Sequence, residues 1–124
     1  MAEIPITVVL PTRNIAKYLP DALASIVAQG GAWRVIAVDS ASTDGTRELL
    51  AAFERAHAGR VKVLDEPRAR LSEAVNLGIA AAEPGWIQWI GGDDRVAPGA
   101  HDHVRRTLAA HPDAEWLIGD IQFR

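Results

Sequence analysis

The amino-acid sequence predicts an α/β domain in which β-strands alternate with amphipathic helices. Two observations indicate this fold class. Short apolar runs rich in Val and Ile recur along the 124 residues, and between them apolar residues repeat at the spacing of one helical face. Strands that alternate with helices form β-α-β units, whose strands pair in parallel. We therefore expect one domain with a mainly parallel sheet and helices on both of its faces.

The first strand and the first helix follow from the residues between Ile6 and Gly31. Residues 6–10 are a short β-branched run that Pro11 is expected to end. Pro20 suits the first turn of a helix. Apolar residues then recur on one helical face as far as residue 27, and Gly30 and Gly31 end the pattern.

The next two strands are predicted at 33–38 and 61–64, with Pro67 closing the second of them. A helix lies between them, because Leu49, Leu50 and Phe53 occur at helical spacing. Ser42 or Thr43 is expected to cap this helix, since a hydroxyl at that place can accept a free backbone N–H of the first turn.

The second half of the chain repeats the alternation of helices and strands. A helix is predicted over 71–79 and a fourth strand over 86–90, which two glycines end. Pro98 opens a helix that continues through Leu108. A fifth strand is expected over 115–121.

Composition and charge exclude several classes of function. The net charge is -3, so no general attraction to nucleic acid is expected. Cysteine is absent, which excludes disulfides and thiolate metal sites. The sequence predicts no signal peptide and no transmembrane segment. We expect a cytoplasmic protein that meets the inner face of the membrane only through partners.

Polar residues follow the predicted strands, at the edge of a parallel sheet where ligands bind. Asp39 comes directly after an apolar strand. The sequence favours two interpretations of it equally, as a ligand contact and as a turn residue. Arg70 is a ligand contact or a solvated surface charge. Histidines 57, 101, 103 and 111 lack metal-ligand spacing, and no function is assigned to them.

The adjacent carboxylates of Asp93 and Asp94 follow the fourth strand through two glycines. An isolated Asp-Asp pair more often marks a turn. Here the pair shares a sheet edge with other polar residues, and two like charges so close together are stabilised by a divalent cation. Oxygen ligands suit Mn²⁺ or Mg²⁺, which bind one or two carboxylates together with substrate phosphates.

Four stretches, in the same order and at similar spacing, resemble family 2 glycosyltransferases. They are similar to the family's opening Pro-Thr-x-Asn turn, its Val-Asp-Asp-Gly-Ser-x-Asp-Gly-Thr stretch, a Glu-Pro segment with a later Asn-x-Gly, and the metal-binding acidic motif. These stretches are residues 9–14, 38–46, 66–78 and 89–100. The resemblance covers essentially the whole chain. It implies the GT-A fold and an inverting transfer from a nucleoside-diphosphate sugar, most often a UDP-sugar.

The resemblance also implies roles for particular residues. Thr12, Asn14 and Asp39 would hold the nucleotide base, usually uracil, and Arg70 would approach the nucleotide. Asp93 would lie near the ribose and would share the Mn²⁺ or Mg²⁺ ion with Asp94. The acceptor would be a glycan or a lipid-linked glycan.

The sequence departs from the family pattern at several places. Ser40 and Ala41 replace an acid and a glycine, and Gly91 stands where many members have the first acid of the metal motif. Arg70 occupies a glycine position in the branch that has the Glu-Pro segment. The general base is not identified, so no catalytic residue is assigned. We expect residues 1–124 to be a truncated nucleotide-sugar-binding domain that does not transfer sugar alone and that self-associates through apolar surface.

Two alternative functions are weighed against this one. A degenerate transferase fragment would bind nucleotide without turnover. A signalling receiver domain has similar length and β-α repeats, and Asp65 could be its acceptor. It also needs an acidic cluster after the first strand and a Lys after the fifth, and this sequence has neither.

Overall fold

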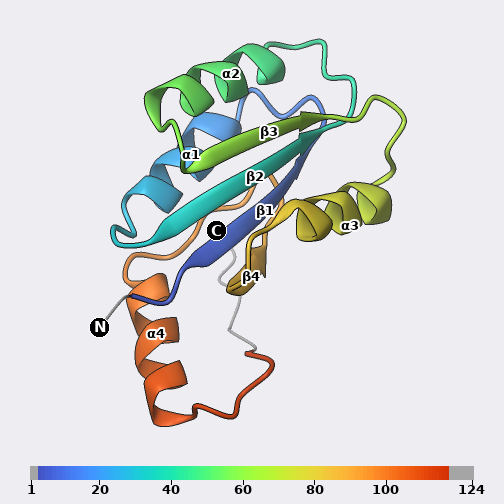
Figure 1. The fold of residues 1–124 in the computed structure, drawn as a ribbon. Coiled ribbons are helices and arrows are strands. Elements are labelled where there is room, and N and C mark those ends of the chain that lie inside the picture. Colours follow the sequence, from blue (N-terminus) through green and yellow to red (C-terminus); the bar gives the residue numbers. More distant parts are fainter. Residues whose placement is uncertain (1–2, 118–124) are drawn as a thin grey trace.

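The fold is described by a computed structural model covering residues 3–117, and Figure 1 shows its strands and helices alternating along the chain. The elements in chain order are β1 (Ile6–Thr12), α1 (Leu19–Val27), β2 (Trp33–Asp39), α2 (Thr46–Ala56), β3 (Val61–Asp65), α3 (Leu71–Ala81), β4 (Trp86–Trp89) and α4 (Ala100–Ala110). The four strands pair in parallel in the order β3-β2-β1-β4. The predicted α/β fold is therefore confirmed.

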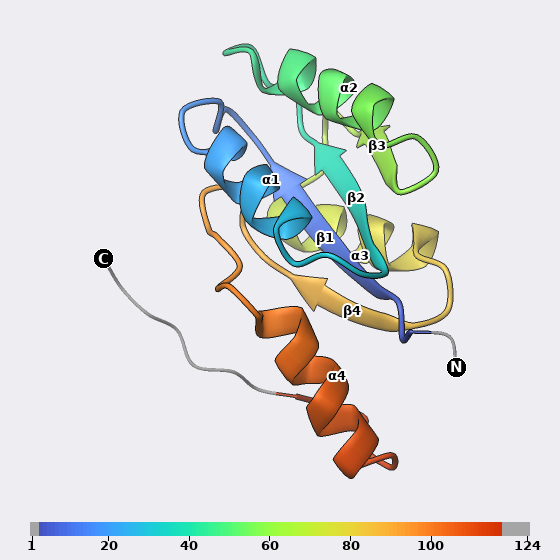
Figure 2. The same cartoon turned by 90° about the vertical axis from the view of Figure 1, so that its left-hand side faces the viewer.

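Helices cover both faces of the sheet. Helices α1 and α2 lie on one face and α3 lies on the other, while α4 extends away from the sheet beyond β4 (Figures 1 and 2). Within residues 3–117, no helix combines the length and the apolar character needed to cross a membrane.

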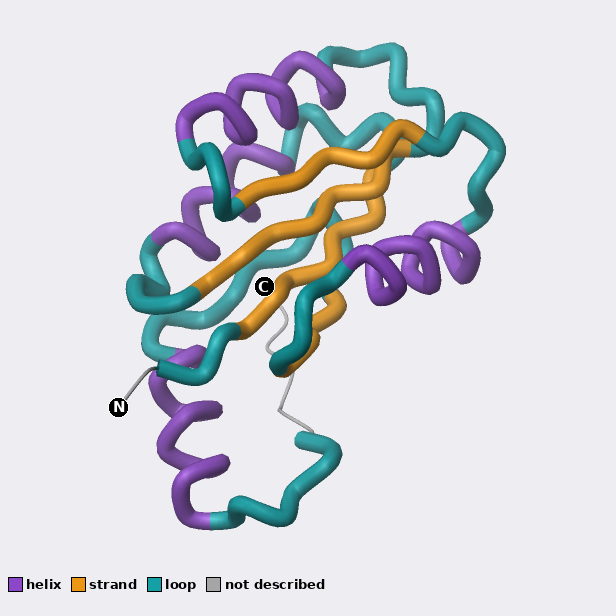
Figure 3. Tube along the Cα trace, viewed as in Figure 1, coloured by secondary structure: helices purple, strands orange, loops and turns teal. Residues whose placement is uncertain are grey.

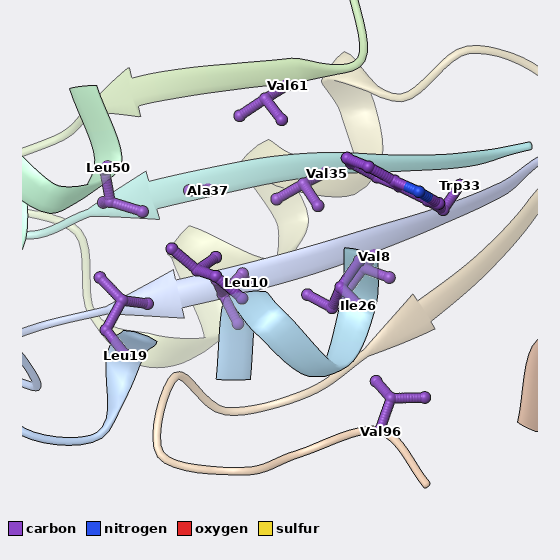
Figure 4. Close-up of a cluster of buried hydrophobic side chains, with 11 residues drawn as sticks. Val8, Leu10, Leu19, Ile26, Trp33, Val35, Ala37, Leu50, Val61 and Val96 are labelled. Atoms are coloured by element: carbon purple, nitrogen blue, oxygen red, sulfur yellow. The ribbon is translucent and has the colours of Figure 1, made fainter. Parts of the chain in front are cut away.

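Alternate residues of the strands supply two separate cores, because successive strand side chains point to opposite faces. Val8 and Leu10 pack in the larger core with α1 and α2, where Trp33 is 2% exposed (Figure 4). On the other face, Ile36 and Val38 pack against α3. Because of this alternation, the core that the earlier residues of a strand join also tells which face of the sheet its last side chain points to.

Strand β1 runs to Thr12, so the expectation that Pro11 ends it was wrong. Thr12 O accepts a hydrogen bond from Ser40 N on the β2 side, and Val9 O accepts one from Ile90 N on the β4 side. Alternation along the strand turns the backbone nitrogen of Pro11 toward β4. Strand β4 has already ended at this level of the sheet. The missing N–H of Pro11 therefore costs no hydrogen bond between the two strands.

The expected fifth strand is not found in the described residues. Residues 115–117 have no regular structure, and residues 118–121 lie outside the described range. The expected cap of α2 was also wrong, because the helix begins at Thr46 and neither Ser42 nor Thr43 caps it. Gly45 is the N-cap residue, and Asp44 just before it accepts hydrogen bonds at Oδ1 from Thr46 N and Thr46 Oγ1.

Helix α4 is joined to the sheet by a buried polar cluster. His101 is fully buried, and its Nε2 lies 2.8 Å from Gln88 Oε1 in β4, which makes Nε2 the protonated nitrogen. The backbone N–H of His101 donates to Gln29 Oε1, and Gln29 Nε2 donates to Ala97 O. These contacts hold the start of α4 against β4 and the end of α1.

Burial lowers the pKa of His101 to about 4, and the charge of Arg105 adds to this shift. As the pH falls below 6.5, His101 becomes protonated in the unfolded chain. In the folded protein it stays neutral until the pH approaches 4. The contribution of His101 to the free energy of unfolding is therefore fully present above pH 6.5 and is lost between pH 6.5 and pH 4, by about 3 kcal/mol.

His101→Gln is accordingly expected to flatten the pH dependence of the free energy of unfolding in that window. Urea unfolding at several pH values measures it. His103→Gln, on the exposed side of the same helix, is the control and is expected to behave like the wild type. Equal pH dependence in His101→Gln and the wild type would contradict this account.

Candidate functional site

Three polar side chains stand in a row at the carboxyl ends of β1, β2 and β3. The strand register places Thr12 opposite Asp39 and Asp39 opposite Asp65. Each residue lies two or four positions after members of the larger core, so all three point to the face that α1 and α2 cover. The loops that follow these strands leave the sheet at the same edge (Figure 3).

Asp39 is the buried centre of this row, with 1% of its surface exposed. Its Oδ1 accepts hydrogen bonds from Thr12 Oγ1 at 2.7 Å and from Ser42 Oγ at 2.6 Å. Its Oδ2 accepts one from Ser42 N at 3.1 Å. A buried carboxylate with three donors is held in one orientation.

Asn14 is joined to the same loop, so the structure brings three predicted site residues together. Asn14 N donates to Ser42 Oγ at 2.9 Å, and Asn14 Oδ1 accepts from Thr43 N at 2.7 Å. With Thr12 and Asp39, Asn14 thus forms a hydrogen-bonded bridge between the β1–α1 loop and the β2–α2 loop.

A second set of bonds ties the same two loops together. Ile15 N donates to Thr46 Oγ1 and Ala16 N donates to Asp44 Oδ2, each at 3.0 Å. The Thr46 hydroxyl bonded to Asp44 is the main cause that lowers the pKa of this carboxyl. Asp44 therefore has a structural role at the start of α2.

Ala41 has a φ of 57°, in the left-handed region that favours glycine. The family pattern has glycine at this position. The turn between Asp39 and Ser42 therefore holds a residue with a side chain in a conformation that glycine adopts more easily, and its strain amounts to about 1 kcal/mol.

Asp93 and Asp94 lie in a tight turn after β4. Asp94 N donates to Gly91 O at 3.0 Å, and Gly91 N donates to Asp94 Oδ2 at 3.1 Å. A Cβ atom on Gly91 would stand 2.9 Å from Asp93 Oδ1 and 3.0 Å from Asp94 Oδ2. Both carboxylates therefore flank Gly91, and a side chain at that position would displace them.

This acidic turn packs against the loop that follows β1. A Cβ atom on Gly92 would stand 2.4 Å from Ile15 Cδ1 and 3.3 Å from Thr12 Cγ2. Strand order reverses between β1 and β4, since β2 and β3 lie on one side of β1 and β4 lies on the other. Ligands of open α/β sheets bind at such a switch point, and both clusters border it.

The acidic turn fits a cation that takes few protein ligands. Among residues 3–117, no three His, Cys, Asp or Glu side chains converge on a possible metal position. Two exposed carboxylates beside an open surface match Mg²⁺ or Mn²⁺, which complete their coordination with water and phosphate oxygens.

Arg70 is the predicted site residue that the structure leaves apart. It is exposed at the start of α3, on the opposite face of the sheet from the Asp39 side chain. Among the described residues, no hydrogen bond or ion pair joins its side chain to Thr12, Asn14 or Asp39. Its approach to the nucleotide stays a prediction.

Three residues around Asp39 were not predicted to belong to the site. Ser42 supplies two of the three donors to the Asp39 carboxylate. Arg47 and Asp65 form an ion pair at 2.9 Å and line, with Asp39, a cavity of about 410 Å³. Asp65 could have been found from the strand register, because it ends β3 beside the end of β2.

The chain belongs to glycosyl transferase family 2, because the model of that family matches residues 7–116. The ordered motifs had indicated this family. A PGL/p-HBAD biosynthesis glycosyltransferase of Mycobacterium tuberculosis is 28% identical over 128 residues, covering 100% of this chain and 49% of the relative. The chain thus spans about half the length of that relative.

Two solved structures share the fold. S. aureus TarS in complex with UDP-GlcNAc gives a TM-score of 0.76 at 21% identity, over 88% of this chain and 32% of TarS. The mannosyltransferase PcManGT of Pyrobaculum calidifontis, in complex with GDP-Man and Mn²⁺, gives 0.71 at 25% identity, over 88% of this chain and 33% of PcManGT. The GT-A expectation is confirmed at the level of the fold.

Proposed function

We propose that this chain binds the nucleoside-diphosphate sugar, a UDP-sugar, of an inverting glycosyltransferase that depends on Mn²⁺ or Mg²⁺. One observation supports this most: a fixed carboxylate at Asp39 and a pair of exposed carboxylates at Asp93 and Asp94 border the same switch point of the sheet. The first suits a nucleobase, and the second suits a cation on a diphosphate.

Each residue has a defined task in this proposal. Asp39 accepts an N–H of the base, while Thr12 and Asn14 hold the loops around it. Asp93 contacts the ribose and, with Asp94, binds the cation. Arg70 approaches the nucleotide from the start of α3. When bound, a divalent cation neutralises the diphosphate charge and so favours departure of the nucleotide.

The reaction we propose is a single displacement at the anomeric carbon. An acceptor hydroxyl oxygen forms the new bond as the bond to the diphosphate oxygen breaks, which inverts the configuration. A general base must take the hydroxyl proton, and no residue of this chain is assigned to that role. We further propose a glycan or lipid-linked acceptor and a cytoplasmic site of action.

Calorimetry of UDP binding tests this function. Affinity is expected to be at least about 10-fold higher with Mn²⁺ than with a chelator, because the cation links Asp93 and Asp94 to the diphosphate. Uridine, which has no diphosphate, is the control ligand and should bind equally in both conditions. If UDP binds equally well with Mn²⁺ and with chelator, the metal role is wrong.

A further inference from the structure

The loop that follows the acidic turn is attached to the end of helix α1 by two polar side chains. Ser25 Oγ accepts a hydrogen bond from Val96 N at 2.9 Å. Gln29 Nε2 donates to Ala97 O at 3.0 Å. Val96 and Ala97 come almost directly after Asp94 in the chain, so these two bonds fix the backbone at the point where it leaves the acidic turn.

Both side chains use their hydrogen-bonding groups fully in this attachment. The hydroxyl of Ser25 donates to Ala22 O at 2.6 Å, which leaves its oxygen to accept from the loop. The amide nitrogen of Gln29 donates to Ser25 O as well as to Ala97 O. Its amide oxygen accepts from His101 N at the start of α4. Gln29 is buried, and a buried network with every group satisfied holds its members in one arrangement.

The other end of the acidic turn contacts the loop that leads into the same helix. A Cβ atom on Gly92 would overlap the side chain of Ile15, so the backbone of the turn lies directly against it. Ile15 O accepts hydrogen bonds from Tyr18 N and Leu19 N at the start of α1. Val96, beyond the turn, packs in the larger core (Figure 4). Helix α1 and the loop before it therefore fix the acidic turn on both sides.

The two carboxylates of the turn depend on this backbone support. Within residues 3–117, no hydrogen bond or ion pair from another element reaches the side chain of Asp93 or Asp94, and Asp94 Oδ2 accepts only from Gly91 N of the same turn. Their positions are therefore set by the path of the backbone. Two like charges this close repel each other, so a turn that is free to shift would let them separate. A cation shared by both needs them held together.

We propose that Ser25 and Gln29 are positioning residues that hold the turn of Asp93 and Asp94 in the geometry that the divalent cation requires; this inference rests on the proposed metal-dependent nucleotide binding. Both act through the backbone of the loop and do not contact the cation. Loss of either attachment should weaken cation binding and leave the surroundings of Asp39 intact, because the bonds to Asp39 come from other loops.

The test is the ratio of UDP affinity with Mn²⁺ to UDP affinity with chelator, measured by calorimetry. Ser25→Ala and Gln29→Leu are each expected to lower this ratio by about 10-fold, the smaller of the losses seen when support for a metal ligand is removed. Their affinity for UDP in chelator should equal that of the wild type. Ser25→Thr keeps a hydroxyl that can bond the carbonyl three residues before it, and should keep the ratio.

Val61→Ala is the matched control for a general loss of stability. It removes buried methyl groups from the larger core at the start of β3, away from the acidic turn, and should keep the wild-type ratio. Hydrogen exchange without metal gives a second measurement. The Asp94 N–H, which donates to Gly91 O within the turn, should exchange faster in Ser25→Ala than in the wild type or Val61→Ala.

Thermal melting shows which variants remain folded. A folded Ser25→Ala or Gln29→Leu with the wild-type ratio would overturn the inference, as would an equal loss in Val61→Ala. A wild type whose UDP affinity does not respond to Mn²⁺ would instead refute the proposed function. The exchange measurement then decides the inference by itself, because an unchanged exchange rate of the Asp94 N–H in Ser25→Ala would overturn it.

Discussion

Asp39→Ala is expected to weaken UDP binding by about 100-fold and to lower the free energy of unfolding by about 3 kcal/mol. The binding loss follows because the base loses its acceptor. The stability loss follows because the buried hydroxyls of Thr12 and Ser42 lose their shared partner. Calorimetry and urea unfolding measure the two effects separately.

Pyrophosphate with Mn²⁺ distinguishes the role of Asp39 from general damage. It lacks a base, so its affinity should be the same in Asp39→Ala and in the wild type. Asp21→Ala removes an exposed acid from the first turn of α1 and should change stability by less than about 1 kcal/mol. A folded Asp39→Ala that binds UDP as the wild type does would show that the base lies elsewhere.

Asp94→Asn is expected to abolish most of the gain in UDP affinity that Mn²⁺ provides. The amide oxygen can still accept the hydrogen bond from Gly91 N, so the turn is preserved while the charge is lost. Loss of even a residue that supports a metal ligand weakens metal sites about 10–100-fold, and loss of a ligand itself should weaken them at least as much. Calorimetry of UDP with and without Mn²⁺ measures the change.

The matched control is Asp113→Asn, which removes an exposed charge from the turn after α4. It should keep the wild-type response to Mn²⁺. If Mn²⁺ raises the UDP affinity of Asp94→Asn as much as it raises that of the wild type, the cation is held by other groups.

The architecture could be predicted from sequence because each element depends on local patterns. Apolar strands alternating with amphipathic helices require parallel pairing, and parallel pairing collects the residues after the strands at one edge. The positions of Asp39, Asp93 and Asp94 followed from this alone. The path of β1 through Pro11 could not be predicted, since it depends on where the neighbouring strand β4 ends.

The details of the site depend on geometry that residue spacing does not contain. Ser42 looked like a helix cap, because a Ser before an amphipathic run usually caps it. In the folded protein the left-handed turn at Ala41 directs Ser42 back to Asp39 instead. His101 gave no signal either, because a single histidine has no pattern and its partners come from β4 and α1.

The most direct test of the central claim is a crystal structure of the protein with UDP and Mn²⁺, using the anomalous signal of manganese. We expect a manganese peak bound by Asp93 and Asp94, with the diphosphate completing the coordination, and uracil N3 hydrogen-bonded to Asp39 Oδ2. A manganese peak away from the turn at residues 91–94, or a uracil that does not contact Asp39, would contradict it.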